Sequence, residues 1–162
     1  MLTREQFLPH EMRIVAALRM QGASDEQVIV RVKSENLFQY PTERMVANRA
    51  TVCLRRLDAM VPTDAVCAAR GIDPKTAVEA ASSLTRLMAS GTPTQADQAI
   101  FYSMICRYDI VRELVLVEVG ERLQNFDYAF TAVDLNAFMT RFTTEYPDAA
   151  RWTEATVKRI KG

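Results

Sequence analysis

Residues 94–160 have the sequence TQADQAIFYSMICRYDIVRELVLVEVGERLQNFDYAFTAVDLNAFMTRFTTEYPDAARWTEATVKRI, and this stretch decides the fold. It divides into four successive helical patterns, TQADQAIFYSMICRY, DIVRELVLVEVGERL, TAVDLNAFMTRFTTEYP and WTEATVKRI. A residue that can cap a helix stands near the start of each pattern: Thr94 with Asp97, Asp109, Thr131 and Thr153. Helices that follow one another in this way predict an all-α protein.

Residues 110–119 are rich in β-branched side chains and have the composition of a strand. A helix is the better interpretation, because β-branching costs only a few tenths of a kcal/mol per residue in a helix. Apolar residues at Val111, Leu114 and Val115 also keep one helical face. The aromatic residues on the flanking helices are expected in the core: Phe101, Tyr102, Phe138 and Phe142.

The composition agrees with a helical protein that buries a sizeable core. The chain has 162 residues and is 49% hydrophobic, with only five Gly and six Pro. A chain of this length forms one compact domain or two small ones. The sequence Val61-Pro62-Thr63 is the best candidate boundary. We therefore expect an N-terminal helix-turn-helix-like unit at 1–61 and a helical bundle at 62–162 that ends in a basic helix.

The N-terminal part is expected to hold three helices, over 9–20, from 25 through 33, and over 42–60. A Ser24-x-x-Gln27 capping box opens the second helix, and Thr42 caps the third. At 100° per residue the third helix has two faces. The apolar face contains Val46, Ala50, Cys53, Leu57 and Met60. The polar face contains Arg44, Asn48, Thr51 and Arg55, flanked by Arg49 and Arg56.

Two interpretations of this polar face remain open. The third helix of a helix-turn-helix can lie in the major groove of DNA, where arginine grips phosphates or guanine and asparagine can pair with adenine. Alternatively, the arginines form a solvated helix face. Lys158 and Arg159 add a second basic cluster on the last helix. The net charge is zero, from 20 basic and 20 acidic side chains, which counts mildly against a non-specific nucleic-acid binder.

Other chemistries find little support in the sequence. A lone histidine, His10, and three widely spaced cysteines argue against a metal site and against a catalytic triad, so we expect no enzyme activity and no cofactor. Reduced thiols indicate a cytoplasmic protein. The most apolar stretch, 110–119, carries charges and is far shorter than the roughly 20 residues of a membrane span.

Three blocks of the sequence resemble the BrxA proteins of bacteriophage-exclusion (BREX) defence systems. They are NRATVCLRRLDAM at 48–60, ADQAIFYSMICRYDIVRELVLVEVGERL at 96–123 and DLNAFMTRFTTEYPDAARWTEATVKRI at 134–160. With a looser match over 9–47, the resemblance covers nearly the whole chain. Members of that family continue past the position of Ile160 with a further apolar helical stretch, so either the natural chain is longer or its last element is missing.

The resemblance implies a small, cytoplasmic, non-catalytic, all-helical protein that binds double-stranded DNA and works with other BREX components. It also implies similarity to the helical RNA-binding protein NusB, so RNA is an alternative ligand and winged-helix-like elements are an alternative architecture. Carried over by motif, the binding residues are Asn48, Arg49, Arg55, Arg56, Thr153, Lys158 and Arg159, and the polar face of the third helix adds Arg44. A protein–protein adaptor that does not bind nucleic acid is the competing hypothesis.

Overall fold

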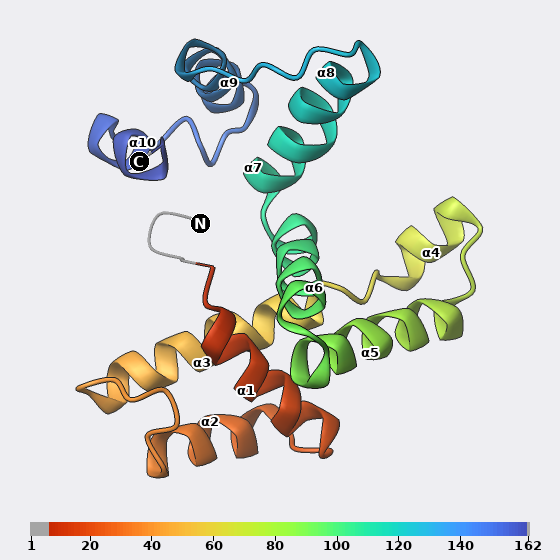
Figure 1. Ribbon diagram of the computed structural model, residues 1–162, viewed down its shortest axis with the longest axis vertical. Coiled ribbons are helices and arrows are strands. Elements are labelled where there is room, and N and C mark those ends of the chain that lie inside the picture. The colour runs from red at the N-terminus through yellow and green to blue at the C-terminus, as the bar shows by residue number, and fades with distance from the viewer. Residues whose placement is uncertain (1–6, 162) are drawn as a thin grey trace. The chain divides into compact units, whose positions relative to one another are not determined.

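The computed structural model describes residues 7–161, and every regular element within them is a helix (Figure 1). The all-α prediction is confirmed. These residues form two compact units, 7–107 and 108–161. Each unit has its own helices and is described by itself.

The unit at 7–107 is built around its first helix. Its helices are α1 (Pro9–Met20), α2 (Asp25–Ser34), α3 (Glu43–Asp58), α4 (Asp64–Arg70), α5 (Pro74–Ser90) and α6 (Pro93–Arg107). Helix α1 packs most extensively on α5 and also contacts α3 and α6, while α2 packs on α3. The fully buried side chains of α1, Met12, Val15 and Ala16, lie in the centre of this core.

The structure groups the helices differently from the expected ranges 1–61 and 62–162. Met88 of α5 and Ile100 of α6 are fully buried in the same core as Val46 of α3. The position expected to separate two domains, 61/62, therefore lies inside the larger unit. The chain is not helical at Pro62, but α5 and α6 fold back onto α1, and α6 also contacts α3.

Local capping signals explain where most of these helices begin. The Ser24 hydroxyl accepts a hydrogen bond from the Gln27 amide at 3.3 Å, and the Gln27 side chain accepts one from the Ser24 amide at 2.8 Å. Thr42 accepts a hydrogen bond from the amide of Met45 at 3.3 Å. Both predicted caps are confirmed. Each cap involves only residues three positions apart, so the local sequence is enough to predict it.

The predicted cap of α6 was wrong by two residues. Thr92, rather than Thr94, accepts a hydrogen bond from the amide of Gln95 at 3.3 Å, and the Gln95 side chain accepts one from the Thr92 amide at 3.0 Å. Pro93 explains the shift, because proline suits the first helical position, where its missing N–H costs nothing.

Two aromatic residues of α6 also differ from their predicted places. Phe101 is 42% exposed and Tyr102 is 45% exposed, so neither is a core residue. The buried positions of this helix are Ala96, Ala99, Ile100 and Ser103. These recur every three to four residues, which turns Phe101 and Tyr102 to the opposite side.

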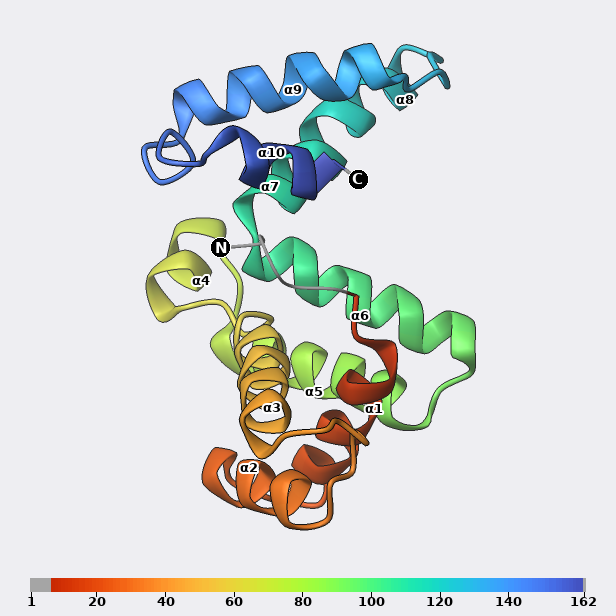
Figure 2. The same ribbon diagram turned by 90° about the vertical axis from the view of Figure 1, so that its left-hand side faces the viewer.

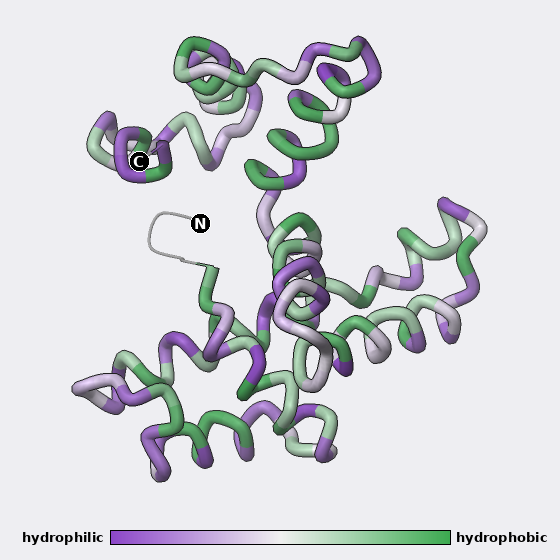
Figure 3. The backbone as a smooth tube through the Cα atoms, in the orientation of Figure 1, coloured by the Kyte–Doolittle hydropathy of each residue, from purple (hydrophilic) through white to green (hydrophobic). Residues whose placement is uncertain are grey.

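The unit at 108–161 begins with one continuous helical run. Its elements are α7 (Asp109–Arg112), the π-helical segment η1 (Glu113–Val119), α8 (Gly120–Gln124), α9 (Ala132–Glu145) and α10 (Glu154–Lys161). The β-branched segment is thus helical, as predicted, and Figure 3 shows its hydrophobic colouring. Asp109 was expected to cap this helix, and that prediction was wrong. It is the first helical residue and forms an ion pair with Arg112.

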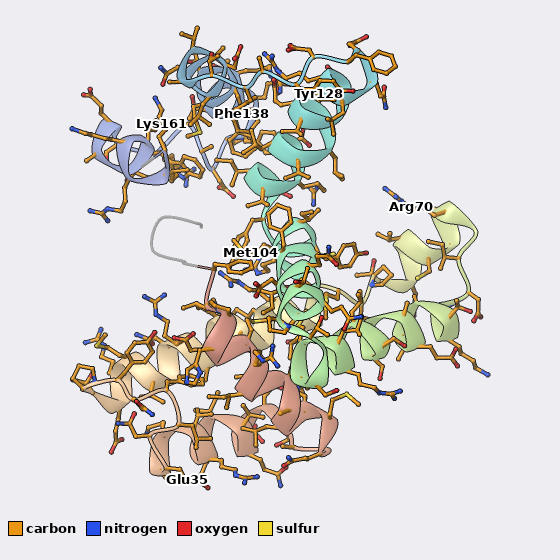
Figure 4. All side chains as sticks on the ribbon, in the orientation of Figure 1. Glu35, Arg70, Met104, Tyr128, Phe138 and Lys161 are labelled. Carbon is orange, nitrogen blue, oxygen red and sulfur yellow. The ribbon has the colours of Figure 1, made fainter. Side chains whose placement is uncertain are left out.

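Helix α9, seen along its length in Figure 2, organises the core of this unit. Its buried face contains Phe138, which Figure 4 labels, together with Met139 and Phe142. The Phe142 ring stacks on Tyr146 with centroids 4.1 Å apart and contacts Trp152 at 5.9 Å. The predicted core residues of α9 are therefore confirmed.

Candidate nucleic-acid interface

One face of α3 presents exposed polar side chains. Arg44, Asn48 and Arg55 are all exposed, and Thr51 between them is half-buried with its hydroxyl donating to the carbonyl of Ala47 at 2.9 Å. Arg44 and Arg55 are eleven positions apart, which at 1.5 Å per residue separates them by about 16 Å along the helix axis. The predicted polar face is therefore present over most of the length of α3.

The carboxylates at the two ends of α3 are occupied by cations from other helices. Glu43 pairs with Lys33 of α2 at 3.2 Å, and Asp58 pairs with Arg19 of α1 at 3.1 Å. Within residues 7–161, neither Arg44 nor Arg55 forms an ion pair. Arg19 also pairs with Asp25 at 2.5 Å. The guanidinium groups of Arg44 and Arg55 are therefore available to bind an external anion.

Sequence reasoning missed the contribution of Lys33 and Arg19 to this face. Lys33 pairs with Glu43 and Arg19 pairs with Asp58, so the two carboxylates of α3 already have cationic partners. No local spacing signals these pairs, because Lys33 and Arg19 reach α3 from separate helices. Only the packing of α1 and α2 against α3 brings the charges together.

Arg49 is in a different environment from the exposed Arg44 and Arg55. It is half-buried near the Tyr40 hydroxyl, which donates a hydrogen bond to the buried carboxylate of Glu11. That hydrogen bond is the main reason why the pKa of Tyr40 is raised, with burial second, while the charge of Arg49 acts in the opposite direction. The positive charge of Arg49 thus interacts in part with the Tyr40–Glu11 pair inside the protein.

Arg56 is not a surface residue, and its assignment to the binding face is corrected here. Its side chain is 0% exposed, and one guanidinium nitrogen donates a hydrogen bond to the carbonyl oxygen of Phe7 at 3.0 Å. The position of Arg56 on α3 places it on the side that carries Cys53 and Leu57, both buried. A ligand outside the protein cannot reach this side chain without local unfolding.

Helix α10 carries the second predicted cluster. Thr153 serves as the cap, accepting a hydrogen bond from the amide of Thr156 at 3.2 Å. Lys158 and Arg159 are exposed, and neither pairs with a carboxylate anywhere in the described part of the chain. Lys161 donates to the side-chain oxygen of Asn136 at 2.6 Å. Helix α3 is a candidate surface of the unit at 7–107, and α10 is a candidate surface of the unit at 108–161.

Residues 7–161 contain no group of three or more His, Cys, Asp or Glu side chains placed to hold a metal ion. His10 is exposed at the start of α1. Among the helices of the same residues, none has the length and apolar content needed to cross a bilayer.

Comparison with known proteins gave one match. The model of the family described as BrxA matches residues 1–162, the whole chain. No curated protein and no solved structure matches the chain. The helix-turn-helix, winged-helix-like and NusB-like architectures therefore stay predictions. The family match confirms the resemblance noted in three blocks of the sequence, and this chain belongs to the BrxA family.

Proposed function

We propose that the protein is a non-catalytic, DNA-binding accessory component of a BREX-type defence system. Membership of the BrxA family suggests the association with BREX components. The observation that supports DNA as ligand is the pair Arg44 and Arg55, which are exposed on one face of α3 while the nearby Glu43 and Asp58 are paired with other cations.

The α3 face suits contact with the phosphate backbone. Duplex DNA carries one negative charge per roughly 1.7 Å of its axis, so the separation of about 16 Å between Arg44 and Arg55 spans several phosphates. Asn48, exposed between the arginines, supplies an amide that can hydrogen-bond a phosphate or an adenine edge. This face has three exposed side chains that can bind DNA: Arg44, Asn48 and Arg55. We therefore propose phosphate contact with little base readout.

Helix α10 supplies a second set of cations, Lys158 and Arg159, on the other unit. Lysine and arginine near the C-terminus of a helix also lie where the helix dipole is negative, which is a favourable position for a positive charge. We propose that this face also contacts phosphates. Its contribution can be measured independently of α3, because Lys158 and Arg159 can be replaced while Arg44 and Arg55 are kept.

The decisive experiment measures duplex DNA affinity as a function of salt for the intact chain and for the double variant Arg44→Ala/Arg55→Ala. Binding through phosphates gives a log–log slope of about −0.9 per neutralised phosphate. We expect the double variant to bind more weakly and to lose roughly two units of that slope. The matched control is Arg70→Ala/Arg86→Ala, which removes the same charge from exposed positions of α4 and α5 in the same unit.

The control separates a specific face from the effect of net charge. If both double variants weaken binding equally, the α3 face has no special role. If the intact chain shows no DNA binding at low salt up to tens of micromolar protein, a concentration that already detects non-specific binding, DNA is not the ligand. Structured RNA that displaces duplex DNA at a lower concentration than unlabelled DNA does would favour RNA as the ligand.

A protein–protein adaptor is the second candidate, favoured by the exposed apolar side chains between Leu116 and Val133. The same variants distinguish the two candidates. Loss of DNA binding by Arg44→Ala/Arg55→Ala, with an unchanged unfolding midpoint, supports the first. Unchanged DNA behaviour together with failure to co-assemble with other BREX components supports the second.

A further inference from the structure

Exposed apolar side chains are frequent around the loop at 125–130, which connects α8 to α9. Phe126 is 78% exposed and Tyr128 is 74% exposed, and Val133 in the first turn of α9 is 75% exposed. Leu116, Leu123 and Phe130 are exposed in the same stretch. Figure 4 labels Tyr128 on this loop. We call residues 116–133 the aromatic loop surface.

The loop that carries these rings is held by one arginine. Nη1 of Arg122 donates to a carboxylate oxygen of Asp127 at 2.6 Å and to the carbonyl of Ala129 at 2.8 Å, while Nη2 donates to Asp134 at 2.7 Å. The same guanidinium lies 5.5 Å from the centre of the Phe130 ring. Phe126 and Tyr128 therefore project from a backbone that is already fixed, which lowers the entropy lost when a partner binds.

The start of α9 fixes the other end of the loop. Thr131 and Asp134 form a capping box, in which the Asp134 carboxylate accepts hydrogen bonds from the amide and hydroxyl of Thr131 at 2.7 and 2.6 Å. These hydrogen bonds are the main cause of the lowered pKa of Asp134, with a smaller contribution from Arg122. The carboxylate thus remains negative and keeps Arg122 engaged.

The surroundings of the exposed rings are acidic. An open hollow of about 260 Å³ is lined by Glu118, Glu121, Arg122, Asn125 and Asp127. Among residues 7–161, the cations that pair with acids of this region are Arg122 and Arg141. Arg122 pairs with Asp127 and Asp134. Arg141 pairs with Glu118 and Glu145. Glu121, exposed beside the hollow, forms no ion pair with any described residue. Carboxylates therefore outnumber guanidinium groups next to Phe126 and Tyr128.

We propose that the aromatic loop surface docks a basic, amphipathic segment of another protein, with apolar side chains against Phe126 and Tyr128 and an arginine or lysine in the hollow beside Glu121. Charge complementarity selects this partner. The carboxylates repel nucleic-acid phosphates, whereas a guanidinium can pair with Glu121 and stack on an aromatic ring. Exposed aromatic anchors beside a charged group are also typical of protein–protein binding sites.

The proposal does not depend on DNA binding. It uses the acids and rings of residues 116–133, and none of the residues proposed to contact phosphates lies in this range. A failure of either proposal therefore leaves the other standing. A protein that uses both surfaces connects nucleic acid to a protein partner.

The test measures binding of the intact chain to a synthetic peptide of leucine, alanine and arginine with the arginines at helical spacing, by calorimetry and by amide chemical shifts. A peptide with glutamate in place of arginine is the charge control. We expect the basic peptide to shift the amides of residues 118–130. Phe126→Ser/Tyr128→Ser should weaken binding by at least about tenfold, as truncation of anchor residues does. Glu121→Gln should weaken it less.

The matched control is Phe101→Ser/Tyr102→Ser, which removes a phenylalanine that is 42% exposed and a tyrosine that is 45% exposed from α6. It should bind the basic peptide like the intact chain. The proposal is overturned if no binding occurs up to about 1 mM peptide, the weak limit of specific recognition. Equal binding of the acidic peptide, or equal weakening by both serine pairs, overturns it as well.

Two further measurements identify other occupants. Sedimentation velocity over a range of concentrations shows whether the chain self-associates. A dimer that Phe126→Ser/Tyr128→Ser abolishes would mean that a second copy occupies this surface, and the proposed partner would be wrong. If the same variant loses duplex DNA affinity while its fold is intact, the surface binds nucleic acid, which also overturns the proposal.

Discussion

The buried guanidinium group of Arg56 donates a hydrogen bond to the carbonyl oxygen of Phe7 over 3.0 Å, joining residues 49 positions apart in the chain. This bond fixes the segment that enters α1 against the inner side of α3. Leu8, the next residue, has a positive φ of 56° and caps α1 without a side-chain hydrogen bond. The entry into the central helix of this unit therefore depends on a contact that is distant in sequence.

Replacing Arg56 by methionine should destabilise the protein by about 2–3 kcal/mol, because a hydrogen bond from a buried charged donor to the Phe7 carbonyl is lost. Methionine keeps most of the apolar volume. The adjacent exposed Arg55→Met is the matched control and should change stability by less than about 0.5 kcal/mol. Urea unfolding midpoints check the difference, and equal midpoints for the two variants would show that Arg56 has no structural role.

The hydrogen bond between Tyr40 and the buried carboxylate of Glu11 should contribute about 1 kcal/mol at neutral pH. Tyr40→Phe removes it and leaves Glu11 without that donor. The exposed Tyr128→Phe is the control and should be neutral. Thermal unfolding of the two variants at neutral pH measures the contribution.

This contribution should also depend on pH in a defined direction. The folded-state pKa of Tyr40 is raised above its ordinary value of 10.0, chiefly by the hydrogen bond to Glu11. The stabilisation is therefore complete below pH 10 and is lost as the pH rises through the raised pKa. The stability difference between the intact chain and Tyr40→Phe should shrink in that alkaline window. A difference that stays constant there would contradict the assigned hydrogen bond.

Removal of the exposed cations of α10 should weaken DNA binding without affecting the fold. We expect Lys158→Ala/Arg159→Ala to reduce the salt slope by up to roughly two units. Arg70→Ala/Lys75→Ala, two exposed positions of α4 and α5, removes equal charge as the control. A slope identical to that of the intact chain would restrict the phosphate contacts to α3.

Two glycines should respond in opposite ways to alanine. A Cβ on Gly120 would meet its nearest neighbour, the Val115 carbonyl oxygen, at an ordinary 3.6 Å, so Gly120→Ala should stabilise the helix by about 0.5–1 kcal/mol. A Cβ on Gly91 would lie 2.5 Å from the Leu87 carbonyl oxygen, so Gly91→Ala should destabilise the protein. Unfolding midpoints that move in the same direction would contradict this geometry.

The sequence predicted most helix boundaries because the signals are local. Ser24 with Gln27 and Thr42 with Met45 each involve residues within one turn of the helix end. The periodic apolar positions of α3 and α9 were equally informative, since a helix places residues three and four apart on one face. At α6 the predicted cap, Thr94, was wrong, because the helix begins at Pro93 and Thr92 accepts the hydrogen bond from the Gln95 amide.

The sequence by itself determined an all-α protein of the BrxA family and a helix, α3, with arginines along one side. Only the tertiary structure decided which of those arginines remain available. Packing of α1 and α2 brings Arg19 and Lys33 to the carboxylates of α3, encloses Arg56 and leaves Arg44 and Arg55 exposed. The physical reason is that helix periodicity fixes the direction of a side chain, whereas its burial and its charge partners come from helices distant in the chain.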